Sequence, residues 1–414
     1  MRNHSLCRAL IIFLVLFSTT AHSQIQKIYL HPKAAGGGKQ SLFVDSIKFV
    51  PLEIKNGIEL GNYSNVQVTQ KYFLITDFPN KLLLLYARNG SFVKKISFKK
   101  LGQQFYPRYH DDGNEIVFWG RNKNYSLTQK DELKIKLDWN NPHNKKYFKK
   151  YKIDLDDSAL QIKKAIPTEN DIVEANQLYD DLYWRGKIET SELYKDSLEY
   201  ELKLYKNDKL VKSFFPYNHI NEPRYLYADD EQTVAFEADT PYIHFVTRPF
   251  CDTIYKVVKD SIFPAYQLVL PLENSLPSTF FTKAFKNKTE RENFRRNNGW
   301  MLHQVYSFYE TQKLIYFGVG YQSNYDTYVY DKKNNVTYKT KNIRPDSSQY
   351  NLQLVGNFSL EREGGRFYKT QKASELIAFF EQNKNVAVPK ELESFLKSNP
   401  PAATPVIVEF KLKN

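Results

Sequence analysis

The hydrophobic positions of the chain fall in short runs that are separated by clusters of turn-forming residues. The clearest example lies between residues 72 and 98, where apolar runs occupy 72–75, 82–86 and 92–96. The first two runs are joined by Asp77-Phe78-Pro79-Asn80, and the last two by Arg88-Asn89-Gly90-Ser91. Asn-Gly between two apolar runs is a strong hairpin signal, because both central residues of the turn must tolerate positive φ. The pattern predicts three antiparallel strands in a meander.

The same pattern recurs along most of the chain. Further short runs lie at residues 116–119, 202–205, 210–211, 233–236, 243–246, 252–257, 266–270, 314–317, 327–330 and 336–338. Short strands with turns between them predict a sandwich, a barrel or a propeller. The runs extend over most of residues 24–414 without a linker rich in Pro, Gly and Ser. In a chain of this length a β-propeller protects its strand edges best, because the sheets close into a ring. We therefore expect an all-β propeller that forms a single domain over residues 24–414.

Helical patterns are few and lie late in the chain. Thr289-Glu290-Arg291-Glu292 resembles a capping box that opens a polar helix towards Trp300. Residues 374–382 and 389–396 also have helical spacing, and Pro389 suits a first turn. We expect these helices to pack against the side or base of the propeller. The last apolar run predicts a closing strand near 405–412, which would pair with N-terminal strand material.

The N-terminus has the pattern of a signal peptide. Arg2 and Arg8 precede or flank an apolar run at 9–17, and Ala21-His22-Ser23 offers small residues for cleavage before Gln24. The run is shorter than the roughly 20 residues that span a bilayer, so a retained anchor is the less favoured alternative. Cys7 precedes the apolar run, which argues against a lipoprotein, and cleavage of residues 1–23 would leave Cys251 without a disulfide partner. We expect an exported protein, periplasmic or secreted, with no membrane span after cleavage.

The amino-acid composition makes the protein basic. Fifty-nine Lys and Arg against 46 Asp and Glu give a formal net charge of +13, and aromatic residues make up 15% of the chain. The lysines lie in short clusters at 94–95, 99–100, 145–146 and 149–150. A solvated lysine-rich surface is the favoured interpretation, and contact with a polyanion such as an acidic polysaccharide or lipid headgroups is the alternative. Nucleic acid is not an expected partner.

Several longer stretches resemble a known family. They are Phe43-Val44-Asp45-Ser46-Ile47-Lys48-Phe49-Val50-Pro51-Leu52-Glu53, Gly61-Asn62 with the run from Tyr72, Thr247-Arg248-Pro249-Phe250-Cys251-Asp252-Thr253-Ile254-Tyr255 followed by Pro264-Ala265-Tyr266, Leu276-Pro277, and Thr404-Pro405-Val406-Ile407-Val408 ahead of Phe410-Lys411-Leu412-Lys413. Together they resemble the six-bladed β-propeller family that is abundant among exported proteins of Bacteroidota. The resemblance implies one propeller of six antiparallel four-stranded blades and a Gram-negative envelope setting. It implies no catalytic residue.

Candidate chemistry is limited to scattered side chains. No nucleophile elbow, zinc-protease motif, paired cysteines or phosphate-binding glycine loop occurs in the sequence, and no cofactor or metal is expected. Arg248 lies four residues before Asp252, and the favoured interpretation is a structural ion pair across Pro249. The alternative is that Arg248 faces the channel and binds an anion. An ordinary surface role is the favoured interpretation of the other arginines considered with it. The candidate ligand-facing residues are Arg108, His110, Arg121, Arg224 and Arg248.

Two histidines are weaker candidates for binding a metal or another ligand. His110 with Asp111 and Asp112 contains ligand-type side chains, but Asp-Gly-Asn after them is ordinary turn chemistry, which is the favoured interpretation. His244 lies inside a predicted strand, where a structural histidine is favoured over a ligand.

Three functions remain open at this stage. The first is a non-catalytic binding module whose ligand, at the top face or central channel, is an acidic or neutral glycan or an envelope protein. The second is a hydrolase or lyase that acts on polysaccharide, since propellers can carry scattered catalytic residues without a linear motif. The third is a structural or assembly role in the envelope.

Overall fold

The apolar runs form the middle strands of small antiparallel sheets. In the first sheet, the strands are β3 (Ser64–Val68), β4 (Tyr72–Asp77), β5 (Leu82–Ala87) and β6 (Phe92–Ser97). Leu74 and Leu85 pair across β4 and β5, and both are fully buried. Their neighbours Ile75 and Leu84 point to the other side of the sheet and are equally buried. The run is continuously apolar because another sheet covers each face.

The computed structural model describes residues 25–53, 55, 64–101, 106–110, 114–122, 128, 144–167, 176–179, 182–186, 198–206, 209–218, 233–238, 240, 243–277, 280, 288–321, 324–356 and 361–414.

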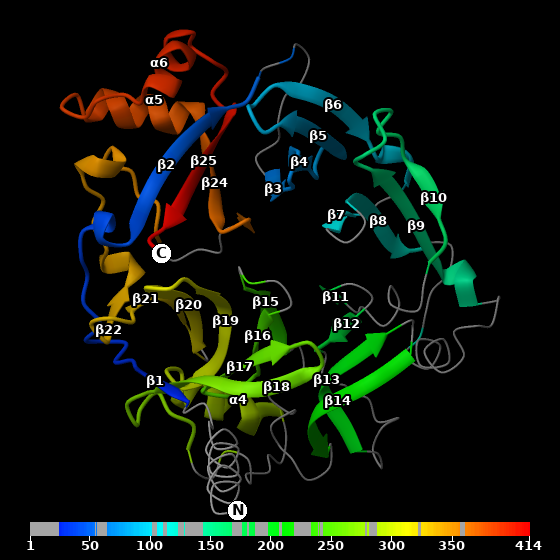
Figure 1. Ribbon diagram of the computed structural model, residues 1–414, viewed down its shortest axis with the longest axis vertical. Coiled ribbons are helices and arrows are strands. Elements are labelled where there is room, and N and C mark those ends of the chain that lie inside the picture. The colour runs from blue at the N-terminus through cyan, green and yellow to red at the C-terminus, as the bar shows by residue number, and fades with distance from the viewer. Residues whose placement is uncertain are drawn as a thin grey trace, which may run out of the picture.

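Six such sheets stand around a common centre (Figure 1). Within each sheet the strands follow chain order from the centre outward, except that N-terminal strands are added at the outside of the fourth and sixth sheets. The second blade holds β7 (Tyr106–His110), β8 (Glu115–Arg121), β9 (Phe148–Asp154) and β10 (Lys163–Ala165). The third holds β11 (Asn176–Tyr179), β12 (Leu182–Arg185), β13 (Leu198–Lys206) and β14 (Lys209–Asn218). The fourth holds β15 (Val234–Glu237), β16 (Ile243–Thr247), β17 (Thr253–Val258) and β18 (Ser261–Val269).

The last two blades complete the ring. The fifth holds β19 (Leu302–Glu310), β20 (Leu314–Tyr321), β21 (Tyr325–Asp331) and β22 (Val336–Lys339). The sixth holds β23 (Glu361–Glu363), β24 (Arg366–Lys372), β25 (Pro405–Leu412) and β2 (Val44–Pro51). The predicted fold class, a six-bladed β-propeller of antiparallel four-stranded blades, is confirmed.

The ring is closed by strands from opposite ends of the sequence. β25 pairs antiparallel with β2, from Ile47 opposite Phe410 to Pro51 opposite Val406, so the sixth blade takes its outer strand from the N-terminal part of the chain. Burial of Phe49 and Val50 against the neighbouring blades fastens this strand. The last apolar run therefore pairs as its sequence suggested.

The segment before β2 runs along three successive blades. β1 (Gln26–Tyr29) pairs parallel with β18, which makes the fourth blade five-stranded where four strands were expected. Gly36 and Lys39 then bridge to Tyr338 and Arg344 at the edge of the fifth blade. The chain from β1 to β2 thus ties the fourth, fifth and sixth blades together from the outside.

Three α-helices are described, and two of them cover the sixth blade. α5 (Ala373–Gln382) and α6 (Lys390–Lys397) bury Leu376 and Leu392 in the apolar cluster shared by the fifth and sixth blades, as expected for peripheral helices. Figure 1 shows both on the outside of the ring beside β2. α4 (Lys288–Asn297) begins one residue before Thr289, so Thr289 lies in the first turn and is not the predicted cap. Short 3₁₀ helices occupy Gln40–Leu42, Lys99–Leu101, Asn144–Tyr147, Thr340–Asn342 and Ser347–Gln349.

Candidate functional site

A pocket of about 410 Å³ lies at the fourth blade, beside its junctions with the third and fifth. The loop from β16 to β17, the end of β18 and the chain that leads to β19 surround it. Its walls include Arg248, Asp252, Leu268, Leu270, Ser275 and Leu276. Leucines therefore line it together with a few polar groups, which is the usual composition of a small-molecule site.

The loop that carries Arg248 is held on the fifth blade by hydrogen bonds at both ends. Thr247 Oγ1 donates to the carbonyl oxygen of Val305 at 2.6 Å, and the backbone N–H of Phe250 donates to that of His303 at 2.6 Å. Phe250 has a φ of 51° and is buried beside Phe280. The left-handed backbone at Phe250 turns the chain between Arg248 and Asp252, which both line the pocket.

Arg248 forms an ion pair with Glu201 of the third blade, so the predicted pairing with Asp252 is wrong. The guanidinium donates to the carboxylate through Nε (2.7 Å to Oε2) and Nη2 (3.1 Å to Oε1), and it lies 4.0 Å from the centre of the Phe215 ring. Asp252 instead accepts hydrogen bonds from Thr253 Oγ1 at 3.0 Å and from Gln267 Nε2 at 3.1 Å. Spacing along the chain could not reveal this, because Glu201 belongs to another blade.

The charges around the pocket are largely compensated. Glu201 has no exposed surface and the side chain of Arg248 is 13% exposed, so the pair is buried and neutral overall. Arg248 Nη1 also donates to the hydroxyl of Tyr255 at 3.4 Å. Burial, with the nearby thiol of Cys251, raises the pKa of Tyr255, which therefore stays protonated. Asp252 is the one carboxylate among the described residues that line this pocket.

The other predicted ligand-facing residues do not join Arg248. Arg108 and His110 are exposed on β7, in the second blade, and neither lines the pocket. The backbone of Arg121 belongs to β8, but its side chain lies outside the described residues, as does all of Arg224. Asp111 and Asp112, the proposed companions of His110, also lie outside them. Within the described ranges, no group of three or more His, Cys, Asp or Glu is placed to hold a metal ion.

Three buried or half-buried ionisable residues have surroundings that the sequence pattern does not predict. Glu201 lies in an alternating strand, where a charged residue ordinarily predicts solvent contact. His244 is buried, as a structural histidine would be, yet neither ring nitrogen has a hydrogen-bond partner within the described part of the chain. Burial, together with Arg362, lowers the pKa of His244 to about 4. Burial also raises the pKa of Glu361 to about 7, although its carboxylate accepts from the Val68 N–H.

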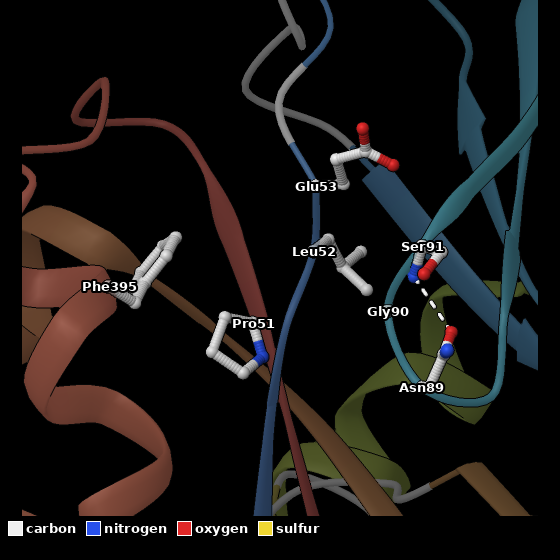
Figure 2. Close-up of a pocket in the computed structure, with 7 residues that line it drawn as sticks. All are labelled: Pro51, Leu52, Glu53, Asn89, Gly90, Ser91 and Phe395. Carbon is white, nitrogen blue, oxygen red and sulfur yellow. Dashed lines mark hydrogen bonds between the residues drawn. The ribbon is translucent and has the colours of Figure 1, made fainter.

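A second hollow of about 250 Å³ marks the junction of the sixth and first blades. Figure 2 shows Phe395 of α6 on one side of Pro51 and the hairpin from Asn89 to Ser91 on the other. The hairpin touches the closing strand closely, because Gly90 O accepts from the Glu53 N–H at 2.9 Å. The carboxylate of Glu53 pairs with Lys55 and accepts from the Phe92 N–H, both at 2.8 Å. We regard this hollow as a product of blade docking.

The fold and its closure define a class, the six-bladed β-propeller sealed by an N-terminal strand. A family model described as a domain of unknown function (DUF4934) matches residues 37–411, so the chain belongs to this family. No curated protein matches the chain.

Two solved structures from Bacteroides are similar to the chain. One is a protein of Bacteroides fragilis NCTC 9343 described as exported, with 15% identity, a TM-score of 0.57 and coverage of 94% of this chain and 100% of that one. The other belongs to the DUF4221 family of Bacteroides vulgatus ATCC 8482, with 11% identity, a TM-score of 0.42 and coverage of 90% and 98%. The resemblance drawn from the sequence is confirmed. No helix among the described residues has the length and apolar character needed to cross a membrane.

Proposed function

We propose that the protein is an exported, non-catalytic binding module that holds a neutral glycan in the pocket of the fourth blade. The main support for this proposal is the composition of that pocket, in which leucine side chains lie around Asp252, Ser275 and an Arg248 whose charge Glu201 neutralises. Export is supported by the signal-peptide pattern of residues 1–23 and by the description of the Bacteroides fragilis neighbour.

The lining suits a ligand that is rich in hydroxyl groups and carries no charge. Asp252 uses part of its accepting capacity on Thr253 and Gln267, and a carboxylate has about four lone-pair sites, so capacity remains for ligand hydroxyls. Ser275 Oγ donates to the carbonyl oxygens of Leu270 (3.2 Å) and Pro271 (3.0 Å), which leaves its lone pairs to accept. The leucines can pack against the C–H faces of a sugar ring. An acidic sugar is less favoured, because Glu201 already neutralises Arg248.

Catalysis is less well supported by the same residues. Glycoside hydrolysis commonly uses two carboxyl groups that flank the bond, whereas the described lining of this pocket offers Asp252 alone. A lyase would need a group that removes a proton, and burial raises the pKa of Tyr255, so its hydroxyl keeps its own proton and is not available as a base. A hydrolase or lyase acting on polysaccharide is therefore the alternative.

The test is thermal melting of the secreted protein with neutral and acidic oligosaccharides. A ligand that prefers the folded state raises the melting temperature, so we expect a rise with a neutral oligosaccharide. Asp252→Asn should abolish the rise, because an amide accepts fewer hydrogen bonds. Asp260→Asn is the matched control, since Asp260 is an exposed carboxylate of the same blade outside the pocket. A rise that survives Asp252→Asn, or turnover of an oligosaccharide, would contradict the proposal.

A further inference from the structure

Lysines gather on the outer strands of the first and second blades. Residues 91–101 and 146–165 together contain ten lysines, three acidic residues and no arginine. β6 and β10 are the outermost strands of their sheets, and Figure 1 shows them along the outer rim of the ring. Lys94 Nζ donates to the carbonyl oxygen of Ala159, in the loop before β10, so the two blades touch here. Lysine pairs that are separate in the sequence therefore share one edge of the molecule, which we call the basic edge.

The pairing of β9 with β10 brings like charges together. Lys163 stands directly opposite Lys152, and Lys164 stands opposite Tyr151. Like charges in directly opposed positions destabilise a sheet. Here Glu115 pairs with Lys152 and Asp157 with Lys163, each at 2.7 Å, so this pair is compensated internally.

Other lysines of the basic edge have no such compensation. The remaining acids are engaged, because Asp156 pairs with Lys71 and the carboxylate of Asp154 accepts from the Asp156 N–H. Within the part of the chain that the structure describes, six lysines of the basic edge lack an acidic partner at ion-pair distance and have at least partly exposed side chains. They are Lys94, Lys95, Lys99, Lys100, Lys149 and Lys164.

We propose that the basic edge binds an acidic polysaccharide, at a site separate from the pocket of the fourth blade. Successive residues of a strand point to opposite faces, so Lys94 and Lys95 present charge on both sides of β6, the outermost strand of the first blade. A flexible chain of carboxylates can wrap around such an edge, whereas a flat membrane reaches one side of it. Lysine ammonium groups, with three rotatable donors each, suit carboxylates at irregular spacing.

A nucleic acid fits the same surface less well. Single-stranded nucleic acid is ordinarily held by exposed aromatic side chains in addition to positive charge. The aromatic residues of the two segments, among them Phe98, Phe148 and Tyr151, are buried or half-buried in the described structure. Charge without stacking surfaces favours a polysaccharide.

The experiment compares two variants of the full secreted protein that each lose four charges. The test variant carries Lys95→Gln, Lys99→Gln, Lys149→Gln and Lys164→Gln. The control carries Lys333→Gln, Lys384→Gln, Lys390→Gln and Lys397→Gln, which are exposed lysines of the fifth blade and of the chain around α5 and α6. Polygalacturonate is the probe, and its affinity is measured at low and high salt.

We expect the native and control proteins to bind polygalacturonate at low salt, and the test variant to bind at least about tenfold more weakly. High salt should weaken native binding, because it screens exposed charges. Asp252→Asn should bind polygalacturonate like the native protein, which separates this site from the pocket. Equal weakening of both lysine variants, or binding that ignores salt, would overturn the proposal. Preference for anionic lipid vesicles or for oligothymidylate over polygalacturonate would overturn it as well.

Discussion

Arg248 of the fourth blade and Glu201 of the third make a two-point ion pair across the seam between their sheets. The two hydrogen bonds measure 2.7 and 3.1 Å, and Phe215 of the third blade lies against the guanidinium plane. Glu201 is fully buried, so water cannot replace its partner. The pair therefore holds two blades together beside the pocket, and Glu201 also neutralises the charge of Arg248.

Replacing Arg248 should destabilise the protein strongly. Arg248→Met removes the two-point ion pair from the buried Glu201 carboxylate, which costs about 3 kcal/mol or more. We expect a matching fall in the free energy of unfolding, measured by urea denaturation. The double variant Arg248→Met, Glu201→Leu should recover a large part of the loss, because it removes the buried carboxylate together with its partner.

Lys163→Gln is the control for this prediction. Lys163 forms an exposed ion pair with Asp157, so its loss should leave the denaturation midpoint unchanged. A stability of Arg248→Met equal to that of Lys163→Gln would show that the buried pair does not join the blades.

Gly90 should not tolerate a side chain. Its φ is 92°, and a Cβ atom there would lie 2.2 Å from the carbonyl oxygen of Pro51 in the closing strand. Gly90→Ala must therefore shift the hairpin away from β2, and we expect the melting temperature to fall by several degrees. Gly364→Ala is the matched control, since Gly364 has a φ of 54° with no atom within 4 Å of a new Cβ. Both variants strain the backbone, so an equal fall would refute the role of close docking at Gly90.

Two buried groups should give opposite dependences of stability on pH. His244 has a pKa of about 4 in the folded protein against about 6.5 ordinarily, so its contribution is lost as pH falls through this window. Glu361 has a pKa of about 7 against about 4.5, so its contribution is present at low pH and lost as pH rises towards 7. Between about pH 4.5 and 6.5 these two effects oppose each other.

Glu361→Gln should expose the effect of His244. The variant should lose about 3 kcal/mol of stability between pH 6.5 and 4 through His244, more than the native protein loses in urea denaturation over the same range. Combining it with His244→Gln should remove the added dependence. Identical pH profiles for the native protein and Glu361→Gln would contradict the raised pKa of Glu361.

Removal of N-terminal segments should distinguish the role of β1, which packs against the fourth and fifth blades, from that of β2, which closes the ring. A protein that begins at residue 33 loses β1 and with it Ile28 and Leu30, both buried against the fourth and fifth blades. Burial of two such side chains contributes roughly 3–5 kcal/mol, so this protein should fold with a lower melting temperature. A protein that begins at residue 53 also loses β2 and should show no cooperative melting by circular dichroism. Cooperative melting without β2 would mean that the ring does not need its closing strand.

Much of the fold was predictable because its signals are local. The meander from β4 to β6 depends on apolar runs joined by tight turns, and Asn89-Gly90 marks its hairpin within four residues. The two C-terminal helices and the strand at 405–412 were predictable for the same reason. The added strand β1 was not, because four residues that pair parallel with β18, more than 200 positions away, leave no local pattern.

The sequence alone determined the class of protein, since alternation, turns and the resemblance of several stretches all depend on residues close together in the chain. Only the tertiary structure decided which charges meet. Arg248 and Asp252 are four residues apart, yet the guanidinium pairs with Glu201, 47 positions earlier, because a propeller packs the faces of neighbouring blades against each other. The basic edge arises in the same way, from lysine clusters that the ring brings side by side. Most strands of a blade follow one another in the chain, so local patterns predict their order. Contacts between blades depend on how twisted sheets pack, which no short stretch of sequence encodes.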